Sequence, residues 1–310
     1  MSHTLDSKIK HCSVVGGEGA VGKMFVGFLR AAGVEVCVID LVASGSTDGA
    51  TSAQLLGDIT NPSKEIEEVL SVTDCVLLAV PEAVTLAAIE VVSSMVSDHV
   101  MIAHTCSVQG PVKAKLEELE RPLESVGFNP MFGPSLPPHG RPVAAIVVRD
   151  GPLVRHLVAI VEGAGVRVVR LSAVEHDRIC GVSQSATHAA IISFGLSLLD
   201  SGVSIEDLAR LAPPPCVTML SLLARVATGA PEVYWDVQTG NPNGAPSRLR
   251  IVDALRQLSQ TVDIGNFREF ERDLNDVAVY LGAGLEYFAS IGQRLLSELP
   301  IFDEEGFGAR

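Results

Sequence analysis

Short runs of apolar, β-prone residues alternate with helical patterns through the first half of the chain. Between the runs, apolar residues recur at the three- and four-residue spacing of an amphipathic helix. This alternation is typical of βαβ units, in which helices cover a parallel sheet. The runs that predict strands are His11–Val15, Val34–Ile39, Cys75–Val80, Val100–Ala103, Leu123–Val126, Val143–Val148 and Val166–Leu171. The helical patterns between them include Val21–Ala32, Ala83–Val96 and Val112–Glu120.

The β pattern stops after Leu171, and only helical patterns follow. Ser172 and Glu175 have the spacing of a capping box, and helical spacing then continues to about Leu199. Ser204 with Asp207 could cap the next helix, which the Pro213–Pro215 run ends. Further helical patterns fill about residues 216–228, 246–263 and 266–298. The sequence therefore predicts an α/β fold in two parts. A doubly wound Rossmann-type domain is expected over residues 1–171 and an all-helical domain over residues 172–310.

Composition narrows the class of protein. The chain has 310 residues, of which 47% are hydrophobic and 19% charged, and a net charge of −14. With no Lys/Arg-rich run, this charge argues against nucleic acid and against a membrane as partners. The six cysteines are scattered, without CxxC or zinc-ligand spacing, which is typical of reduced thiols and predicts no metal. No secretory pattern and no apolar run of about 18 residues was identified, so we expect a cytoplasmic protein.

A glycine-rich segment joins the first predicted strand to the first helix. Its G-x-G-x-x-G spacing is that of a dinucleotide site, in which the first glycine forms the turn and the second admits a pyrophosphate. The third glycine lets helix and strand pack closely, and the helix N-terminus faces the phosphates. Val80 and Pro81 end a later strand at the same edge. The residues predicted to bind the cofactor here are Gly17, Gly19, Ala20, Val21, Gly22, Val80 and Pro81.

Asp40 ends the second predicted strand, at about the distance from the glycines that the dinucleotide motif requires. A carboxylate there accepts hydrogen bonds from the ribose hydroxyls and repels a 2′-phosphate. The residues that follow, Leu41–Gly45, include no Arg or Lys to neutralise such a phosphate. The predicted cofactor is NAD rather than NADP. The alternative is a Rossmann-like domain that binds another nucleotide or none.

Residues 129–134 read Asn-Pro-Met-Phe-Gly-Pro. They resemble the His-Pro-Met-Phe-Gly-Pro signature of the prephenate and arogenate dehydrogenase family, with Asn129 in place of the His. The resemblance covers about residues 11–298 and includes the segments Ala79–Thr85, Cys106–Gln109, Ser172–Asp177 and Glu232–Gln238. It implies NAD-dependent oxidative decarboxylation of a dicarboxylate cyclohexadienyl acid held between the two domains. It also implies a homodimer formed through the helical domain.

The resemblance assigns roles to several polar residues. Ser107 matches a serine that hydrogen-bonds the catalytic His and the substrate, although it could instead cap a helix. His188 matches a His that lines the substrate pocket, and Arg225 matches an arginine that holds a carboxylate. Their alternatives are a structural histidine and a solvated arginine, although the apolar residues beside Arg225 favour its partial burial. Further candidates are Gln184, on the helix face of His188, Asp177 and Gly181, and Arg248 and Arg250 for the second carboxylate; His176 and Asp177 are interpreted as structural.

Asn129 changes the chemistry that the resemblance implies. In the family, the His removes the proton of the 4-hydroxyl as hydride leaves C4 for the nicotinamide, and such a base contributes about 10²–10⁴-fold. An Asn amide cannot be that base. A 4-amino group needs none in the hydride step, because its lone pair gives an iminium that keeps its protons. The sequence therefore favours 4-amino-4-deoxyprephenate as substrate, with Asn129 accepting an N–H.

Three alternatives to this substrate remain. One is an ordinary prephenate or arogenate dehydrogenase, in which His188 or a water replaces the base. The second is a dehydrogenase for another cyclohexadienyl acid. The third is an inactive homologue that binds NAD without turnover, which the retained glycines, Ser107, His188 and Arg225 argue against.

Overall fold

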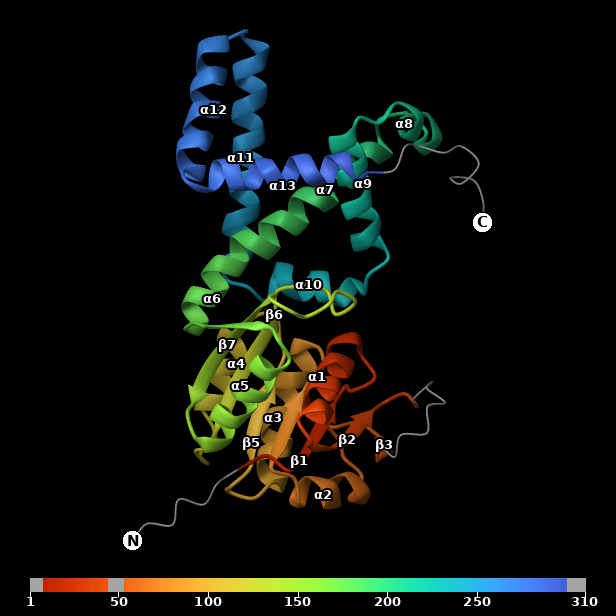
Figure 1. The fold of residues 1–310 in the computed structure, drawn as a ribbon, viewed down its shortest axis with the longest axis vertical. Coiled ribbons are helices and arrows are strands. Elements are labelled where there is room, and N and C mark those ends of the chain that lie inside the picture. The colour runs from red at the N-terminus through yellow and green to blue at the C-terminus, as the bar shows by residue number, and fades with distance from the viewer. Residues whose placement is uncertain (1–7, 44–52, 300–310) are drawn as a thin grey trace. The chain divides into compact units, whose positions relative to one another are not determined.

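The computed structural model describes residues 8–43 and 53–299. The chain forms two compact units, Met1–Cys180 and Gly181–Arg310. Figure 1 shows a sheet covered by helices in the first unit and helices alone in the second. The predicted domain boundary was at residue 171, whereas the two units divide after Cys180. The helix between these positions packs on the first unit.

One eight-stranded sheet forms the centre of the first unit, in the order β3-β2-β1-β4-β5-β6-β7-β8. Neighbouring strands run parallel except at β6 and β7, which pair antiparallel. The predicted Rossmann-type α/β fold is confirmed, as a mixed sheet. The strands are β1 His11–Val15, β2 Glu35–Asp40, β3 Gln54–Leu56, β4 Cys75–Leu78, β5 Met101–His104, β6 Ser125–Pro130, β7 Pro142–Arg149 and β8 Arg167–Arg170.

Helices cover both faces of this sheet and bury two apolar clusters. One cluster lies under α1 and α5 and includes Phe25 and Phe128, whose ring centroids are 5.7 Å apart. The other lies under α2, α3 and α4 and includes Ile66, Ile89 and Leu116. Buried on both faces, the central strands read as continuous apolar runs. The helices of this unit are α1 Ala20–Ala31, α2 Lys64–Ser71, α3 Glu82–Met95, α4 Gly110–Glu117, α5 Pro152–Gly163 and α6 Ala173–Cys180.

The second unit is all-helical, as predicted. Its expected helix over 266–298 is two helices, since the chain breaks at Gly282, where φ is +49°. A short helix, α10, was not predicted. A six-residue π-helical turn, η1, stands between α6 and α7. The elements are η1 Gly181–Ala186, α7 Thr187–Leu199, α8 Ile205–Leu211, α9 Pro214–Ala227, α10 Pro231–Thr239, α11 Gly244–Asp263, α12 Phe267–Leu281 and α13 Gly284–Ser297.

The helical run Ala173–Leu199 is long and apolar enough to cross a membrane by length and composition. The pair Pro214–Ala227 and Pro231–Thr239 passes the same test together, although it bends by 98°. The sequence-based expectation that no apolar run would be long enough to span a membrane is therefore corrected. Length and composition alone do not show that the long run crosses a membrane. Its first turns carry His176 and Asp177, two polar side chains that are buried within the protein.

Candidate active site

The turn between β1 and α1 is built from glycines that no other residue can replace without movement. Gly16 has φ +76°, and a Cβ there would lie 2.4 Å from the carbonyl oxygen of Ala79. The left-handed turn is therefore at Gly16, one residue before the glycine predicted to form it. A Cβ on Gly17 would lie 2.7 Å from the Val38 side chain, and one on Gly22 would lie 2.1 Å from the Gly16 carbonyl oxygen. Gly22 thus allows close packing of α1 on the turn.

A cavity of about 380 Å³ lies beside this turn, at the carboxyl ends of β1, β2 and β4. Dinucleotides bind at this edge of doubly wound sheets. Four of the predicted cofactor residues line it, and Gly17, Ala20, Val21 and Gly22 do not. The lining residues are Val15, Gly16, Glu18, Gly19, Ile39, Asp40, Leu41, Val42, Gly57, Asp58, Ile59, Ala79, Val80, Pro81 and Val84.

The charge of this cavity distinguishes between the two nicotinamide cofactors. The Asp40 carboxylate accepts hydrogen bonds from the Glu18 N–H at 2.9 Å and the Val42 N–H at 3.3 Å. Glu18 and Asp58 add two more carboxyl groups, and hydrogen bonds from Thr60 lower the pKa of Asp58. No Arg or Lys is among the described residues that line the cavity. These carboxylate acceptors therefore fit the free hydroxyls of an adenosine ribose and disfavour a 2′-phosphate.

Asn129 lies near the end of β6 and is 2% exposed. Its Nδ2 is 3.0 Å from His176 Nε2 and donates to the Ser107 carbonyl oxygen at 3.4 Å. The Cys180 Sγ is 4.0 Å from Nδ2 and 3.3 Å from His176 Nε2. The structure thus brings two of the predicted catalytic residues, Ser107 and Asn129, into contact.

His176 and Asp177 complete this buried cluster, although sequence reasoning assigned them only a structural role. His176 Nδ1 is 2.8 Å from Asp177 Oδ1, and both side chains are almost fully buried. The same carboxylate accepts the main-chain N–H groups of Gln109 and Gly110 at 3.0 and 2.8 Å. The sequence feature that could have indicated a role in the site is this His-Asp pair, which stands just before the long apolar run that continues to Leu199.

His104 and Gln109 form a second buried polar pair, and His104 pairs across the sheet with Gly127 of β6, two residues before Asn129. His104 Nδ1 accepts from the Cys106 N–H at 3.3 Å, and Gln109 Nε2 donates to the Cys106 carbonyl at 2.6 Å. Within the described residues, His104 Nε2 and Gln109 Oε1 have no hydrogen-bond partner. A Cβ on Gly127 would approach both atoms within 2.5 Å. Burial, and secondarily the charge of His176, lowers the pKa of His104 to about 3.

In the second unit, His188 contacts Tyr234 edge-on, with 5.0 Å between ring centroids. Burial, and then the nearby Arg225, lowers the pKa of His188, so the ring is neutral at pH 7. His188 Nδ1 and Gln184 Oε1 are buried and have no partner among the described residues. Regular α-helical spacing would place Gln184 and His188 on one face with Asp177. The π turn η1 between α6 and α7 interrupts that spacing, so they do not share a face with Asp177. That part of the sequence interpretation is corrected.

The predicted arginines differ in their surroundings. Arg225 is exposed on α9, whereas its apolar sequence neighbours suggested partial burial. Arg250 is also exposed and donates to Ser247 Oγ at 2.8 Å. Arg248 donates to the carbonyl and side-chain oxygens of Gln238, both at 2.8 Å. Of the two candidates on α11, Arg248 is thus engaged within the protein, and the exposed Arg250 is the better placed to meet a ligand.

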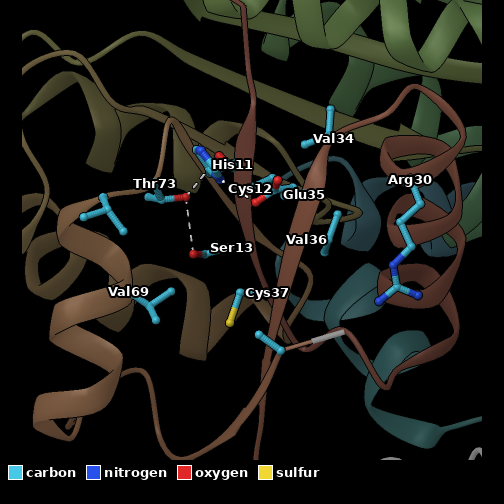
Figure 2. A pocket seen from close by; sticks show the side chains of 12 residues that line it. His11, Cys12, Ser13, Arg30, Val34, Glu35, Val36, Cys37, Val69 and Thr73 are labelled. Atoms are coloured by element: carbon cyan, nitrogen blue, oxygen red, sulfur yellow. Dashed lines mark hydrogen bonds and ion pairs between the residues drawn. The ribbon is translucent and has the colours of Figure 1, made fainter. Parts of the chain in front are cut away.

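A larger cavity, of about 530 Å³, lies at the amino ends of β1 and β2, opposite the glycine turn (Figure 2). It is lined by His11, Arg30, Glu35, Cys37 and Thr73 among others, and by none of the predicted site residues. Burial raises the pKa of the Cys37 thiol, so this cysteine is not an activated thiolate. Within the described part of the chain, no group of three or more His, Cys, Asp or Glu side chains forms a metal site.

Two family models match the chain. They are "Prephenate dehydrogenase, nucleotide-binding domain" over residues 25–141 and "Prephenate dehydrogenase, dimerization domain" over residues 172–276. The chain is 43% identical over 278 residues to the 4-amino-4-deoxyprephenate dehydrogenase of Streptomyces pristinaespiralis, covering 89% of this chain and 93% of that protein. It is 27% identical over 277 residues to a probable arogenate/prephenate dehydrogenase of Methanocaldococcus jannaschii, covering 87% of this chain and 61% of the relative.

Solved structures show the same fold. The prephenate dehydrogenase from A. aeolicus in complex with hydroxyphenyl propionate and NAD+ is similar with a TM-score of 0.72 and 20% identity, covering 88% of this chain and 97% of that one. The Synechocystis arogenate dehydrogenase has a TM-score of 0.64 and 18% identity, covering 86% of this chain and 97% of that one. At these identities the likeness concerns the fold.

Proposed function

The chain belongs to the prephenate dehydrogenase family and is an NAD-dependent dehydrogenase, and we propose that its substrate is 4-amino-4-deoxyprephenate, which it converts to 4-aminophenylpyruvate. The observation on which the proposal rests is Asn129, in place of the family His, buried beside Ser107 and His176. The 43% identity to the Streptomyces pristinaespiralis enzyme, whose name gives the same substrate, supports it.

The nucleotide site suits NAD. The glycine turn leaves room for a pyrophosphate, and Asp40 is positioned for the ribose hydroxyls. When bound, NAD supplies the acceptor for the hydride that leaves C4 of the substrate. The three carboxyl groups that line the cavity repel a 2′-phosphate, because like charges at such separations disfavour each other. We therefore expect turnover with NAD to exceed turnover with NADP.

The chemistry of the amine explains why an Asn is sufficient. As hydride leaves C4, the nitrogen lone pair forms a C=N bond and the nitrogen becomes an iminium that retains both protons. The C1 carboxylate then leaves as carbon dioxide, its bonding electrons neutralise the iminium, and the ring becomes aromatic. No proton is removed in the hydride step, so Asn129 needs only to accept an N–H hydrogen bond.

The substrate is a dicarboxylate, and its carboxylates require cations. We assign these roles to Arg225 and Arg250, which are exposed in the second unit. An arginine fork holds a carboxylate in a defined plane. His188 and Gln184, with buried polar atoms that lack a partner among the described residues, are further substrate contacts in this proposal.

A second copy of the chain is the proposed partner. Residues 172–276, most of which lie in the second unit, match a dimerization domain. In the single chain, its helices expose large apolar side chains that a subunit interface would cover, including Leu196, Leu255, Tyr280 and Phe288, which are 58–87% exposed. Such an interface also provides a place for the apolar run Ala173–Leu199 without a membrane.

Prephenate is the second candidate substrate, and one observation favours it. The lowered pKa of His188 keeps its ring neutral near pH 7, and Nδ1 has no partner among the described residues. A neutral imidazole is able to act as the base that Asn129 is not.

The test compares initial rates of NADH formation at 340 nm with 4-amino-4-deoxyprephenate, prephenate and arogenate. We expect the amino substrate to be turned over with the highest kcat/KM. Equal or faster turnover of prephenate, lost in the His188→Asn variant, would replace the proposal with the second candidate. Binding of NAD without turnover of any of the three would instead indicate an inactive homologue.

A further inference from the structure

We propose that His176 and Asp177 are positioning residues that fix the orientation of the Asn129 side-chain amide, so that Oδ1 is the atom presented to the substrate. The role of that oxygen in catalysis rests on the proposed function. The orientation of the amide does not, because it follows from hydrogen bonds within the first unit.

The first step is the tautomer of His176. Asp177 accepts main-chain N–H groups at both of its oxygens, from Gln109 at Oδ1 and from Gly110 at Oδ2. An ionised carboxylate has no proton to donate. The 2.8 Å contact between Asp177 Oδ1 and His176 Nδ1 is therefore a hydrogen bond that the imidazole donates. In the neutral ring, Nδ1 then carries the hydrogen and Nε2 has the free lone pair.

The second step is the orientation of Asn129. Its amide nitrogen lies between two acceptors, His176 Nε2 at 3.0 Å and the Ser107 carbonyl oxygen at 3.4 Å. The two hydrogens of Nδ2 satisfy both. In the flipped amide, Oδ1 would face two acceptors and no donor, in a site that is almost fully buried, which is strongly unfavourable.

The Cys180 thiol also lies near this contact, at 3.3 Å from His176 Nε2. A thiol is a weak donor. Asn129 Nδ2 is also 0.3 Å closer to Nε2, being 3.0 Å away rather than 3.3 Å. The thiol does not reverse the orientation of the amide.

The third step is what remains of the Asn129 side chain. The side-chain hydrogen bonds of Asn129 within residues 8–43 and 53–299 are all made by Nδ2, and none is made by Oδ1. Oδ1 is therefore a hydrogen-bond acceptor with a fixed direction and with no donor among the described residues. An iminium nitrogen only donates, and its N–H groups become more acidic as charge develops, so the hydrogen bond to Oδ1 strengthens in the transition state.

Kinetics of two variants test the positioning role. His176→Phe keeps a ring and removes the acceptor, so the amide is free to flip. We expect its kcat with 4-amino-4-deoxyprephenate to fall about tenfold or more while KM changes about twofold or less. His176→Gln, which can accept from Asn129 and donate to Asp177, should recover part of the loss. The matched control is Val174→Ala on the same helix, where the valine is 80% exposed.

Nitrogen NMR of the wild-type protein tests the geometry without any variant or substrate. The His176 ring should show a protonated Nδ1 and an unprotonated Nε2 near pH 7.5, with scalar coupling from Nε2 to the Asn129 amide nitrogen. A protonated Nε2 would overturn the proposal, as would unchanged kcat in folded His176→Phe. If the enzyme does not turn over the amino substrate, the proposed function fails, whereas the NMR result still decides the orientation.

Discussion

The main-chain N–H of Gly110 donates to Asp177 Oδ2 at 2.8 Å and joins the first residue of α4 to α6. A Cβ on Gly110 would lie 2.9 Å from the same oxygen, so the carboxylate sits directly over the helix start. A carboxylate at a helix N-terminus satisfies free N–H groups and interacts favourably with the helix dipole. Asp177 thus fixes α6 and the Asn129 cluster on the sheet.

The first prediction concerns this carboxylate. In Asp177→Asn, an NH2 group must replace one acceptor oxygen and leave at least one buried donor unpaired. We expect the free energy of unfolding to fall by about 2–4 kcal/mol. Urea unfolding followed by circular dichroism measures it. Asp207→Asn, on the surface of α8, is the control and should change it by about 0.5 kcal/mol or less; an equal loss in both variants would contradict the prediction.

The second prediction concerns Asn129. The Asn129→His variant restores the group that acts as general base in the family, and its activity with prephenate should rise about 10²-fold or more. The measurement is kcat/KM with prephenate and with the amino substrate for both proteins. Since the site is buried, NAD binding and the melting temperature of the variant should be checked first. A correctly folded variant with no gain would show that the missing base is not what limits prephenate turnover.

The third prediction compares two glycines of α1. In Gly22→Ala, the added methyl group would lie 2.1 Å from the Gly16 carbonyl oxygen, so the turn must open and NAD affinity should fall tenfold or more, on the order of 1.4 kcal/mol. At Gly27 nothing lies within 4 Å of an added Cβ. Gly27→Ala should instead stabilise the helix by about 0.5–1 kcal/mol and leave NAD binding unchanged. Calorimetric titration and thermal unfolding measure the two effects.

The fourth prediction concerns His104, whose pKa burial lowers to about 3. Below pH 6.5 the unfolded chain binds a proton at this residue that the folded protein does not, so stability is lost as pH falls. The loss is about 1.4 kcal/mol per pH unit between about pH 6 and pH 4, and it is absent above pH 7. His104→Asn keeps an acceptor for Cys106 and removes the titration. Its stability measured in urea should fall less steeply with pH than that of the wild type; equal slopes would show that another group dominates.

The fold was predictable where one local pattern decided it. Strands buried on both faces read as apolar runs, so β1, β2, β4 and β5 were located within one or two residues. β3 was missed because three residues are too few for a pattern. The antiparallel direction of β7 was not predictable either, because an apolar run reads the same whichever way its strand points.

The site was predictable only in part, for a related reason. The glycine spacing, Asp40 and the unusual Asn129 are visible in short segments. The contact of Asn129 with His176 joins residues 47 positions apart, and it depends on how α6 packs against β6. A His-Asp pair in a helix start has many structural explanations, and nothing in its spacing indicates which buried amide it will meet.

The π turn η1 has a consequence for how sequence changes act on this chain. One residue on a regular helix advances the direction of side chains by about 100°, and a wide turn absorbs an extra residue without a bulging loop. Deleting a single residue between Cys180 and Thr187 would therefore let the run close into regular helix with almost no change in length. The deletion would also leave His188 facing Tyr234, because the wide turn had already absorbed the extra residue. An alignment should therefore permit a one-residue gap within η1, because residues on α7 then correspond in direction although their distance from α6 along the chain differs by one.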